Sequence, residues 1–210
     1  MRHCAIIHPL HLELETANRM VIILPQSCEQ TLLDRFLRAE AMALGSVRAA
    51  KTMKVPPHVL AFLHRHEADE QDHLRQFEVL LGTSSQEKFA RPRVPTQWAA
   101  LAVHLFGYEA LGLEFAELLV MVRPDLASIV RDEKVHVNFF EREVYHLLAE
   151  SSIRAKETRD SATGWWRRFP KTLDRYLSGE ALDPYREVLR EGVKESIHKR
   201  FNLAGLLTDL

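Results

Sequence analysis

The chain has 210 residues, of which 46% are hydrophobic and 27% are charged, and its formal net charge is −1. This composition is ordinary for a globular protein with one full core, and a near-neutral chain has no overall field that would attract nucleic acid or an anionic membrane. It contains no apolar run of about 18 residues and no signal-peptide pattern at the N-terminus. Its two cysteines form no CxxC pair, and so few favour a reducing compartment. We therefore expect a cytoplasmic protein with no nucleic-acid or membrane partner.

Helical periodicity dominates the chain after its first 25 or so residues. Apolar residues recur at spacings of three and four, which predicts amphipathic helices and an all-α fold. The predicted helices cover residues 28–53, 57–81, 96–122, 125–150, 161–178 and 184–201. The third is apolar all round, which is typical of a helix buried in a core. Residues 151–160 are predicted to be a charged link.

These elements predict one domain with three parts. Residues 1–27 form an N-terminal arm, residues 28–150 form a four-helix bundle, and residues 151–210 supply further helices that pack on the bundle. The paired tryptophans Trp165 and Trp166 are interpreted as the anchor of these C-terminal helices.

Two of the predicted helices contain the sequence Asp-Glu-x-x-His. The second helix carries it from Asp69 to His73, and the fourth from Asp132 to His136. A Glu and a His three residues apart lie on one helix face, about one turn from each other, so both side chains can reach one metal ion. Carboxylate and imidazole ligands suit iron, manganese or zinc. One such motif is a weak signal, but two copies in one chain strongly indicate a metal site.

Each motif helix follows a helix that carries a glutamate in an apolar setting. Glu40 and Glu109 both begin the pattern Glu-Ala-hydrophobic-small-Leu, so the chain contains a cryptic repeat over about residues 36–77 and 105–140. Two such hairpins packed face to face would supply the four glutamates and two histidines of a carboxylate-bridged di-iron bundle. The predicted ligands are Glu40, Glu70, His73, Glu109, Glu133 and His136. Four carboxylates also roughly neutralise two divalent ions.

The ligand from the third helix is open between Glu109 and Glu114. Counted from the turn at Arg123, Glu114 is level with Glu133, whereas Glu109 lies five residues deeper, or about 7.5 Å along a helix. Simple geometry favours Glu114 and the internal repeat favours Glu109, which we prefer. The two side chains point about 140° apart, and a π-bulge in this helix would reconcile height with direction.

Other polar residues near the motifs receive ordinary interpretations. Glu67 is read as a surface charge. Four further histidines of the helices, His64, His66, His104 and His146, are read as polar or interface residues. The expected lining of a substrate pocket is Phe36, Phe106, Phe115 and Phe140.

Residues 126–140 resemble the fourth-helix signature of the oxygenase and hydroxylase branch of the ferritin-like di-iron superfamily, and the resemblance covers about residues 30–148. It implies a ferritin-like four-helix bundle with two iron ions, a manganese–iron pair being an alternative. It also implies that Asp69 and Asp132 hold the ligand histidines by hydrogen bonds. Phe77 lies four residues after His73, where ribonucleotide reductase small subunits have a radical tyrosine, which argues against that activity.

Three functions are compatible with this resemblance. The favoured one is an O₂-dependent oxygenase or hydroxylase that acts on a small or apolar organic substrate with electrons from an external donor. The alternative is an iron-binding protein or ferroxidase without an organic substrate. The third is a scaffold without redox chemistry. The apolar helices make a homodimer plausible. The sequence identifies no catalytic residue beyond the metal ligands.

Overall fold

The computed structural model describes residues 24–84 and 92–207, and every regular element in these ranges is helical. The predicted all-α class is thus confirmed for the described residues. The long helices are α1 (Glu29–Ala50), α2 (Pro57–Leu81), α3 (Trp98–Val122), α4 (Ala127–Glu150), α5 (Ser152–Tyr176) and α6 (Arg186–Leu203). The short 3-10 turns are η2 (Gln26–Cys28), η3 (Pro124–Leu126) and η4 (Glu180–Tyr185). Most of the predicted N-terminal arm, residues 1–23, lies outside the described residues.

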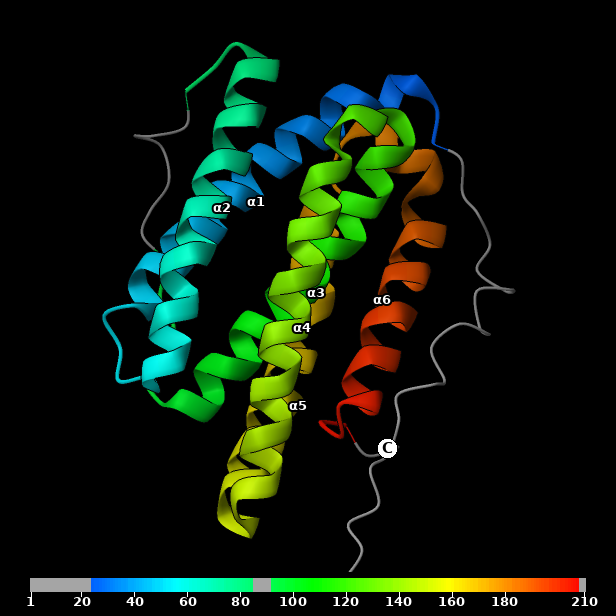
Figure 1. The fold of residues 1–210 in the computed structure, drawn as a ribbon. Coiled ribbons are helices and arrows are strands. Elements are labelled where there is room, and N and C mark those ends of the chain that lie inside the picture. The colour runs from blue at the N-terminus through cyan, green and yellow to red at the C-terminus, as the bar shows by residue number, and fades with distance from the viewer. Residues whose placement is uncertain (1–23, 85–91, 208–210) are drawn as a thin grey trace, which may run out of the picture.

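Two antiparallel helix pairs, α1–α2 and α3–α4, form the body of the fold (Figure 1). The first pair turns at Pro56 and Pro57, and Pro57 begins α2 because a proline in the first turn of a helix loses no backbone hydrogen bond. α2 ends at Leu81, and Gly82 caps it with a φ of 60° that other residues rarely adopt. The second pair turns through η3, which begins at Pro124. The turns therefore stand where proline and glycine predicted them.

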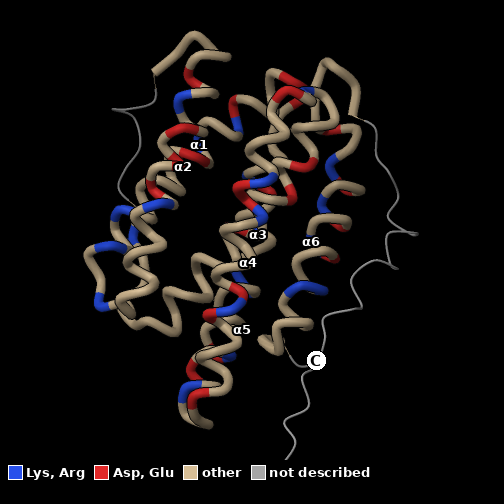
Figure 2. Tube along the Cα trace, viewed as in Figure 1, with Lys and Arg blue, Asp and Glu red and all other residues tan. Residues whose placement is uncertain are grey.

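α3 lies at the centre of the molecule and contacts α1, α4, α5 and α6. Of its 25 residues, 17 are buried, which explains why this helix has no polar face. Few charges lie on it, whereas α6 carries both signs along its length (Figure 2). Burial of so much apolar surface is the main stabilising contribution that the sequence of this helix makes.

The prediction that residues 151–160 form a charged link is wrong, because α5 occupies almost all of this segment. The helix begins at Ser152, because Ser151 accepts a hydrogen bond from the backbone N–H of Arg154 and so caps its N-terminus. The charged residues at its start form one exposed face, with ion pairs such as Lys156 to Asp160. The charges are a solvated helix surface rather than a connection.

Trp165 fastens α5 to the core, as the sequence predicts. Its ring packs against Phe169 and Phe201 and lies over Gly107 of α3. A Cβ atom at Gly107 would stand 2.4 Å from Trp165 Cε2, which is too close for any side chain. The glycine thus permits the approach of α5 to α3. Trp166 contacts Phe169 and His198.

Within the described ranges, none of the helices combines the length and the apolar character that a membrane span requires.

Candidate metal centre

The six ligands predicted from the sequence lie together in the space between the two helix pairs. α1 supplies Glu40, α3 supplies Glu109, and the two motif helices supply a glutamate and a histidine each. All six side chains are buried. Together with His66, they form two groups of four that share Glu70, and in each group the potential ligand atoms lie within 4.8 Å of one another.

The first group consists of Glu40, Glu70, His73 and Glu133. His73 Nδ1 lies 3.5 Å from Glu40 Oε2 and 3.8 Å from Glu133 Oε1. Gly112 of α3 permits this arrangement, because a Cβ atom there would stand 3.0 Å from Glu133 Oε2. The group places one imidazole nitrogen among three carboxylates, a donor set that suits a hard divalent ion such as Fe(II) or Mn(II).

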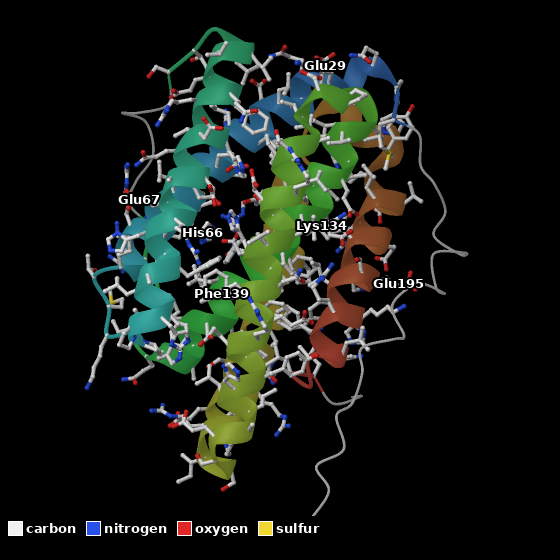
Figure 3. The ribbon with its side chains drawn as sticks, viewed as in Figure 1. Glu29, His66, Glu67, Lys134, Phe139 and Glu195 are labelled. Atoms are coloured by element: carbon white, nitrogen blue, oxygen red, sulfur yellow. The ribbon has the colours of Figure 1, made fainter. Side chains whose placement is uncertain are left out.

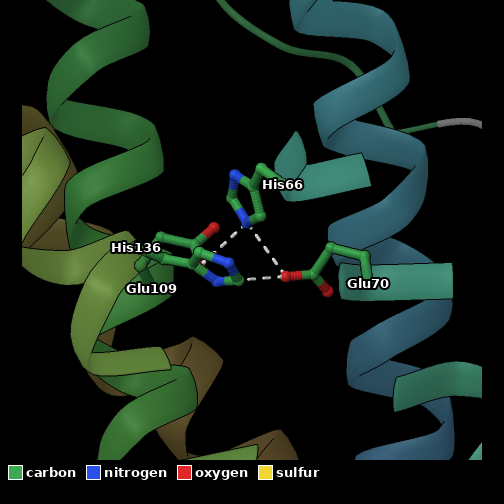
Figure 4. A group of neighbouring side chains, drawn as sticks. All are labelled: His66, Glu70, Glu109 and His136. Carbon is green, nitrogen blue, oxygen red and sulfur yellow. Dashed lines mark hydrogen bonds and ion pairs between the residues drawn. The ribbon is translucent and has the colours of Figure 1, made fainter. Parts of the chain in front are cut away.

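The second group consists of His66, Glu70, Glu109 and His136 (Figure 4). His136 Nδ1 lies 3.6 Å from both Glu70 Oε1 and Glu109 Oε2. His66 Nε2 lies 2.9 Å from Glu70 Oε1 and 3.3 Å from Glu109 Oε2. Glu70 belongs to both groups.

His66 is the site residue that the sequence interpretation missed. It is fully buried and points toward the cluster, whereas its neighbour Glu67 points outward and pairs with Arg48 and Lys51 (Figure 3). A signal was present in the sequence, since His66, Glu70 and His73 stand at positions i, i+4 and i+7 and therefore share one helix face. The interpretation of Glu67 as a surface charge agrees with its ion pairs.

Glu109, rather than Glu114, is the glutamate of α3 that reaches the cluster. Glu114 is also buried, but it faces α6, where Ser196 Oγ donates a hydrogen bond to Glu114 Oε1 at 2.5 Å. α3 is α-helical throughout, so the π-bulge considered from the sequence is not present. Counting from the turn favours the wrong glutamate because Glu109 pairs with His136, one turn beyond Glu133, just as Glu40 pairs with His73 in the other hairpin.

The aspartate of each motif accepts a hydrogen bond from the histidine of the other motif. Asp69 of α2 accepts a hydrogen bond from His136 Nε2 of α4 at 3.1 Å, and Asp132 of α4 accepts one from His73 Nε2 of α2 at 3.3 Å. Each bond holds the ring so that Nδ1 faces the glutamates. A carboxylate in this position fixes the tautomer of a metal-binding histidine and increases its basicity.

Burial is the largest influence on the pKa values of the cluster. It raises the pKa of Glu70 and of Glu133, and the neighbouring carboxylates raise both further. Burial disfavours a charged His73, but Glu40 and Glu70 outweigh it and raise the pKa of His73 to about 10. The pKa of Glu109 is lowered despite its burial, because His66 and His136 lie beside it. Four carboxylates in this space thus require positive charge among them.

Several atoms that face the cluster have no hydrogen-bond partner among the described residues. They are Oε2 of Glu40, Glu70 and Glu133 and Nδ1 of His73 and His136. A buried polar atom without a partner is unfavourable by roughly 1–3 kcal/mol. Five such atoms directed into one small volume fit a centre in which metal ions are the missing partners.

A cavity of about 210 Å³ adjoins the cluster, and Glu40, Glu109 and Glu133 form part of its wall. Phe36 and Phe115 line it, as expected from the sequence. Phe106 and Phe140 do not, which corrects the expected lining: Phe106 stacks on Phe201, and Phe140 packs on Phe62. Tyr176 of α5 is a lining residue that the sequence did not suggest.

No protein-family model matches this chain, and no curated protein matches it in sequence. The structure thus establishes a helical protein with buried carboxylate and histidine groups that could bind metal ions.

Proposed function

We propose that this chain is a ferritin-like di-iron carboxylate protein that oxidises a small organic substrate with O₂. One observation carries the proposal: two overlapping groups of buried carboxylate and imidazole ligands share Glu70 and adjoin a largely apolar cavity. The ligand set of four glutamates and two histidines is that of di-iron bundles, and His66 would add a third histidine.

The residues present fit a pair of divalent ions. Glu40, His73 and Glu133 would hold one ion, His66, Glu109 and His136 the other, and Glu70 both. Carboxylates suit this role because they can bind one ion or bridge two as the charge on the metal changes. Two ferrous ions would supply the electrons with which O₂ is reduced, and an external donor would restore them.

The chain itself would position the substrate and exclude water. Phe36 and Phe115 provide apolar walls next to the three glutamates, so a substrate carbon can lie close to the metal ligands. Asp69 and Asp132 hold the two histidine rings in place and keep their donor nitrogens directed inward. The buried setting strengthens electrostatic interactions within the centre.

The alternative is an iron-binding protein or ferroxidase that oxidises iron and has no organic substrate. The cavity favours the oxygenase, because iron oxidation requires no apolar space beside the ligands. Unlimited iron uptake into a large assembly would instead support storage.

The first test is metal content. We expect protein produced with iron to hold up to two ions per chain, and Glu70→Ala and Glu133→Ala each to lose at least one. Glu109→Gln should also lose an ion, whereas Glu114→Gln, the matched control on the same helix, should retain both. Retention of both ions in Glu70→Ala and Glu133→Ala would refute the ligand assignment, and an iron-grown protein without metal would refute the proposal.

The second test is consumption of O₂. The reduced, iron-loaded protein should consume O₂ and develop a transient visible absorption band, and the Glu70→Ala variant should do neither. A metal-loaded protein that is inert to O₂ would support the scaffold instead.

A further inference from the structure

A second cavity lies beside the one at the metal ligands. It measures about 370 Å³ and is lined by residues of α3 and α5 and of the segment before α3. The two cavities share Arg93, His104 and Tyr108 as wall residues. His104 and Tyr108 are four residues apart on α3, and their rings lie 4.8 Å from each other. These side chains form the boundary between an outer cavity and an inner cavity.

The outer cavity is positively charged. Arg93 and Arg168 line it, and its lining contains no aspartate or glutamate. Both arginines are exposed, and neither forms an ion pair or hydrogen bond with another residue in the described parts of the chain. This contrasts with Arg35 of the inner cavity, whose Nε and Nη2 donate to the carbonyl oxygen of Ser178 at 3.0 and 2.7 Å. Two guanidinium groups are thus available beside a space without acidic residues.

His104 adds no charge to this boundary at neutral pH. Burial lowers its pKa, and the nearby Arg168 lowers it further, to about 4. Of the three side chains at the boundary, Arg93 is thus the charged one, whereas the neutral His104 ring and the Tyr108 hydroxyl are polar.

The inner cavity has a different character. Its exposed surface is mainly apolar, and it ends at Glu40, Glu109 and Glu133. A cavity of about 150 Å³ lined by apolar side chains accepts benzene, so about 210 Å³ accommodates one ring with a substituent or a short alkyl chain. Along α3, His104 at the boundary and Glu109 in the cluster are five residues apart, or about 7.5 Å. A small ligand that extends inward from the boundary can therefore approach the proposed metal ligands.

From the juxtaposition of these two cavities, we infer that the substrate is a small apolar carboxylic acid, with its carboxylate beside Arg93 and Arg168 and its apolar end against the metal ligands. The inference rests on the proposed function for what happens at the apolar end. Arginine suits the head group because its planar fork can donate two parallel hydrogen bonds to a carboxylate. The acid would be oxidised at the end remote from its carboxylate.

The test compares acids with matched alcohols by titration calorimetry on the full-length protein, purified after production with iron. The probes are hydrocinnamate and hexanoate, each paired with the corresponding neutral alcohol. We expect at least one acid to bind more tightly than its alcohol, with a preference that weakens as salt is added. Acids that bind no better than their alcohols would overturn the inference.

Variants test which residues bind the carboxylate end of the ligand and which bind its apolar end. Arg93→Gln and Arg168→Gln should each weaken binding of the acid about tenfold or more, without changing binding of the alcohol. Arg167→Gln, an exposed neighbour that lines neither cavity, is the matched control and should bind the acid normally. Ala43→Leu, which fills the inner cavity, should weaken acid and alcohol alike. Unchanged acid binding in both arginine variants or in Ala43→Leu would contradict the inference.

Metal content measured on the same samples separates the two proposals. Protein that prefers acids but holds no metal would refute the di-iron proposal alone. Protein that holds two ions but shows no preference for acids would refute the substrate assignment alone.

Discussion

His66 Nε2 lies 2.9 Å from Glu70 Oε1, one helical turn away on α2, and the symmetry of the two hairpins provides no counterpart to this contact. When the two motifs are aligned, Glu70 falls on Glu133 and His66 falls on Ile129, which is buried in the apolar core. One group of ligands therefore has two histidines and the other has one. The His66 nitrogen that does not contact Glu70, Nδ1, is buried and has no partner among the described residues. In His73 and His136, by contrast, the nitrogen that faces away from the glutamates is Nε2, and it donates a hydrogen bond to an aspartate.

Replacing His66 should therefore affect one ion more than the other. In His66→Ile, which copies the residue of the opposite half, we expect the affinity for one ion to fall at least tenfold, a loss comparable with that of a residue supporting a ligand. The second ion should remain. Stepwise titration with Mn(II) or Co(II), followed by metal analysis, measures both affinities.

His64→Gln is the control for His66. His64 lies on the same helix but is exposed, so its replacement should leave both affinities unchanged. Equal loss of both ions in His66→Ile, with an unchanged helical circular dichroism spectrum, would mean that the two groups are not separate sites. Unchanged affinities would remove His66 from the ligand set.

Asp69 and Asp132, each of which binds the histidine of the other motif, should affect metal affinity without binding the metal themselves. Asp69→Asn and Asp132→Asn should each lower metal affinity by about 10- to 100-fold, because an amide does not support an imidazole ligand as a carboxylate does. Their side chains are about half exposed, so the fold should tolerate both changes. Asp72→Asn is the control, since Asp72 is exposed and contacts Gln76 instead. Metal affinities like those of the unchanged protein would show that the aspartates serve only the fold.

Local patterns in the sequence predicted most of the helices and six of the seven side chains of the buried cluster. Pro57, Leu81, Val122 and Glu150 bound helices where proline, glycine and periodicity placed them. The Glu-x-x-His pairs needed only the spacing of one helix. Short-range rules suffice here because each signal lies within one or two turns.

Features that depend on several helices were not predictable in the same way. The choice of Glu109 depends on how α3 is set against α4, and a count of residues from the turn gave the wrong level. Tyr176 lines the inner cavity only because α5 packs beside α3. The start of α5 was missed for a different reason: the Ser151 cap was visible in the sequence, but the charged residues after it resembled a link.

The pH dependence of stability should reverse when metal is bound. The pKa values of Glu70 and Glu133 are raised by burial and by neighbouring carboxylates, and the pKa of His73 is raised to about 10. Because the pKa of His73 is raised from 6.5 to about 10, the folded protein without metal holds more protons than the unfolded chain between pH 6.5 and 8.5. Its stability should fall as pH rises through this window, by about 1.4 kcal/mol per pH unit for each extra proton.

Metal ions require the same groups without protons, so their stabilising effect should grow over that window. Thermal unfolding of chelator-treated protein and of protein saturated with Mn(II), each from pH 6.5 to 8.5, tests both slopes. His104, with a pKa of about 4, titrates below this window and does not complicate the comparison. Chelator-treated protein that gains stability as pH rises would contradict the assigned pKa directions.

The close approach of α5 to α3 should make Gly107 intolerant of substitution. A Cβ atom there would stand 2.4 to 2.8 Å from three atoms of the Trp165 ring, and this ring is buried among Phe169 and Phe201 and cannot move aside cheaply. Gly107→Ala should therefore destabilise the protein by roughly 1–3 kcal/mol, the usual range for overpacking a core.

Gly192→Ala provides the opposite case, because Gly192 is exposed within α6 and its Cβ would meet no atom within 4 Å. That change should stabilise the protein by about 0.4–1 kcal/mol, since alanine reduces the entropy of the unfolded chain. Urea unfolding of both variants measures the two effects, and a Gly107→Ala variant as stable as the parent would show that α5 does not pack against α3 as closely as the structure indicates.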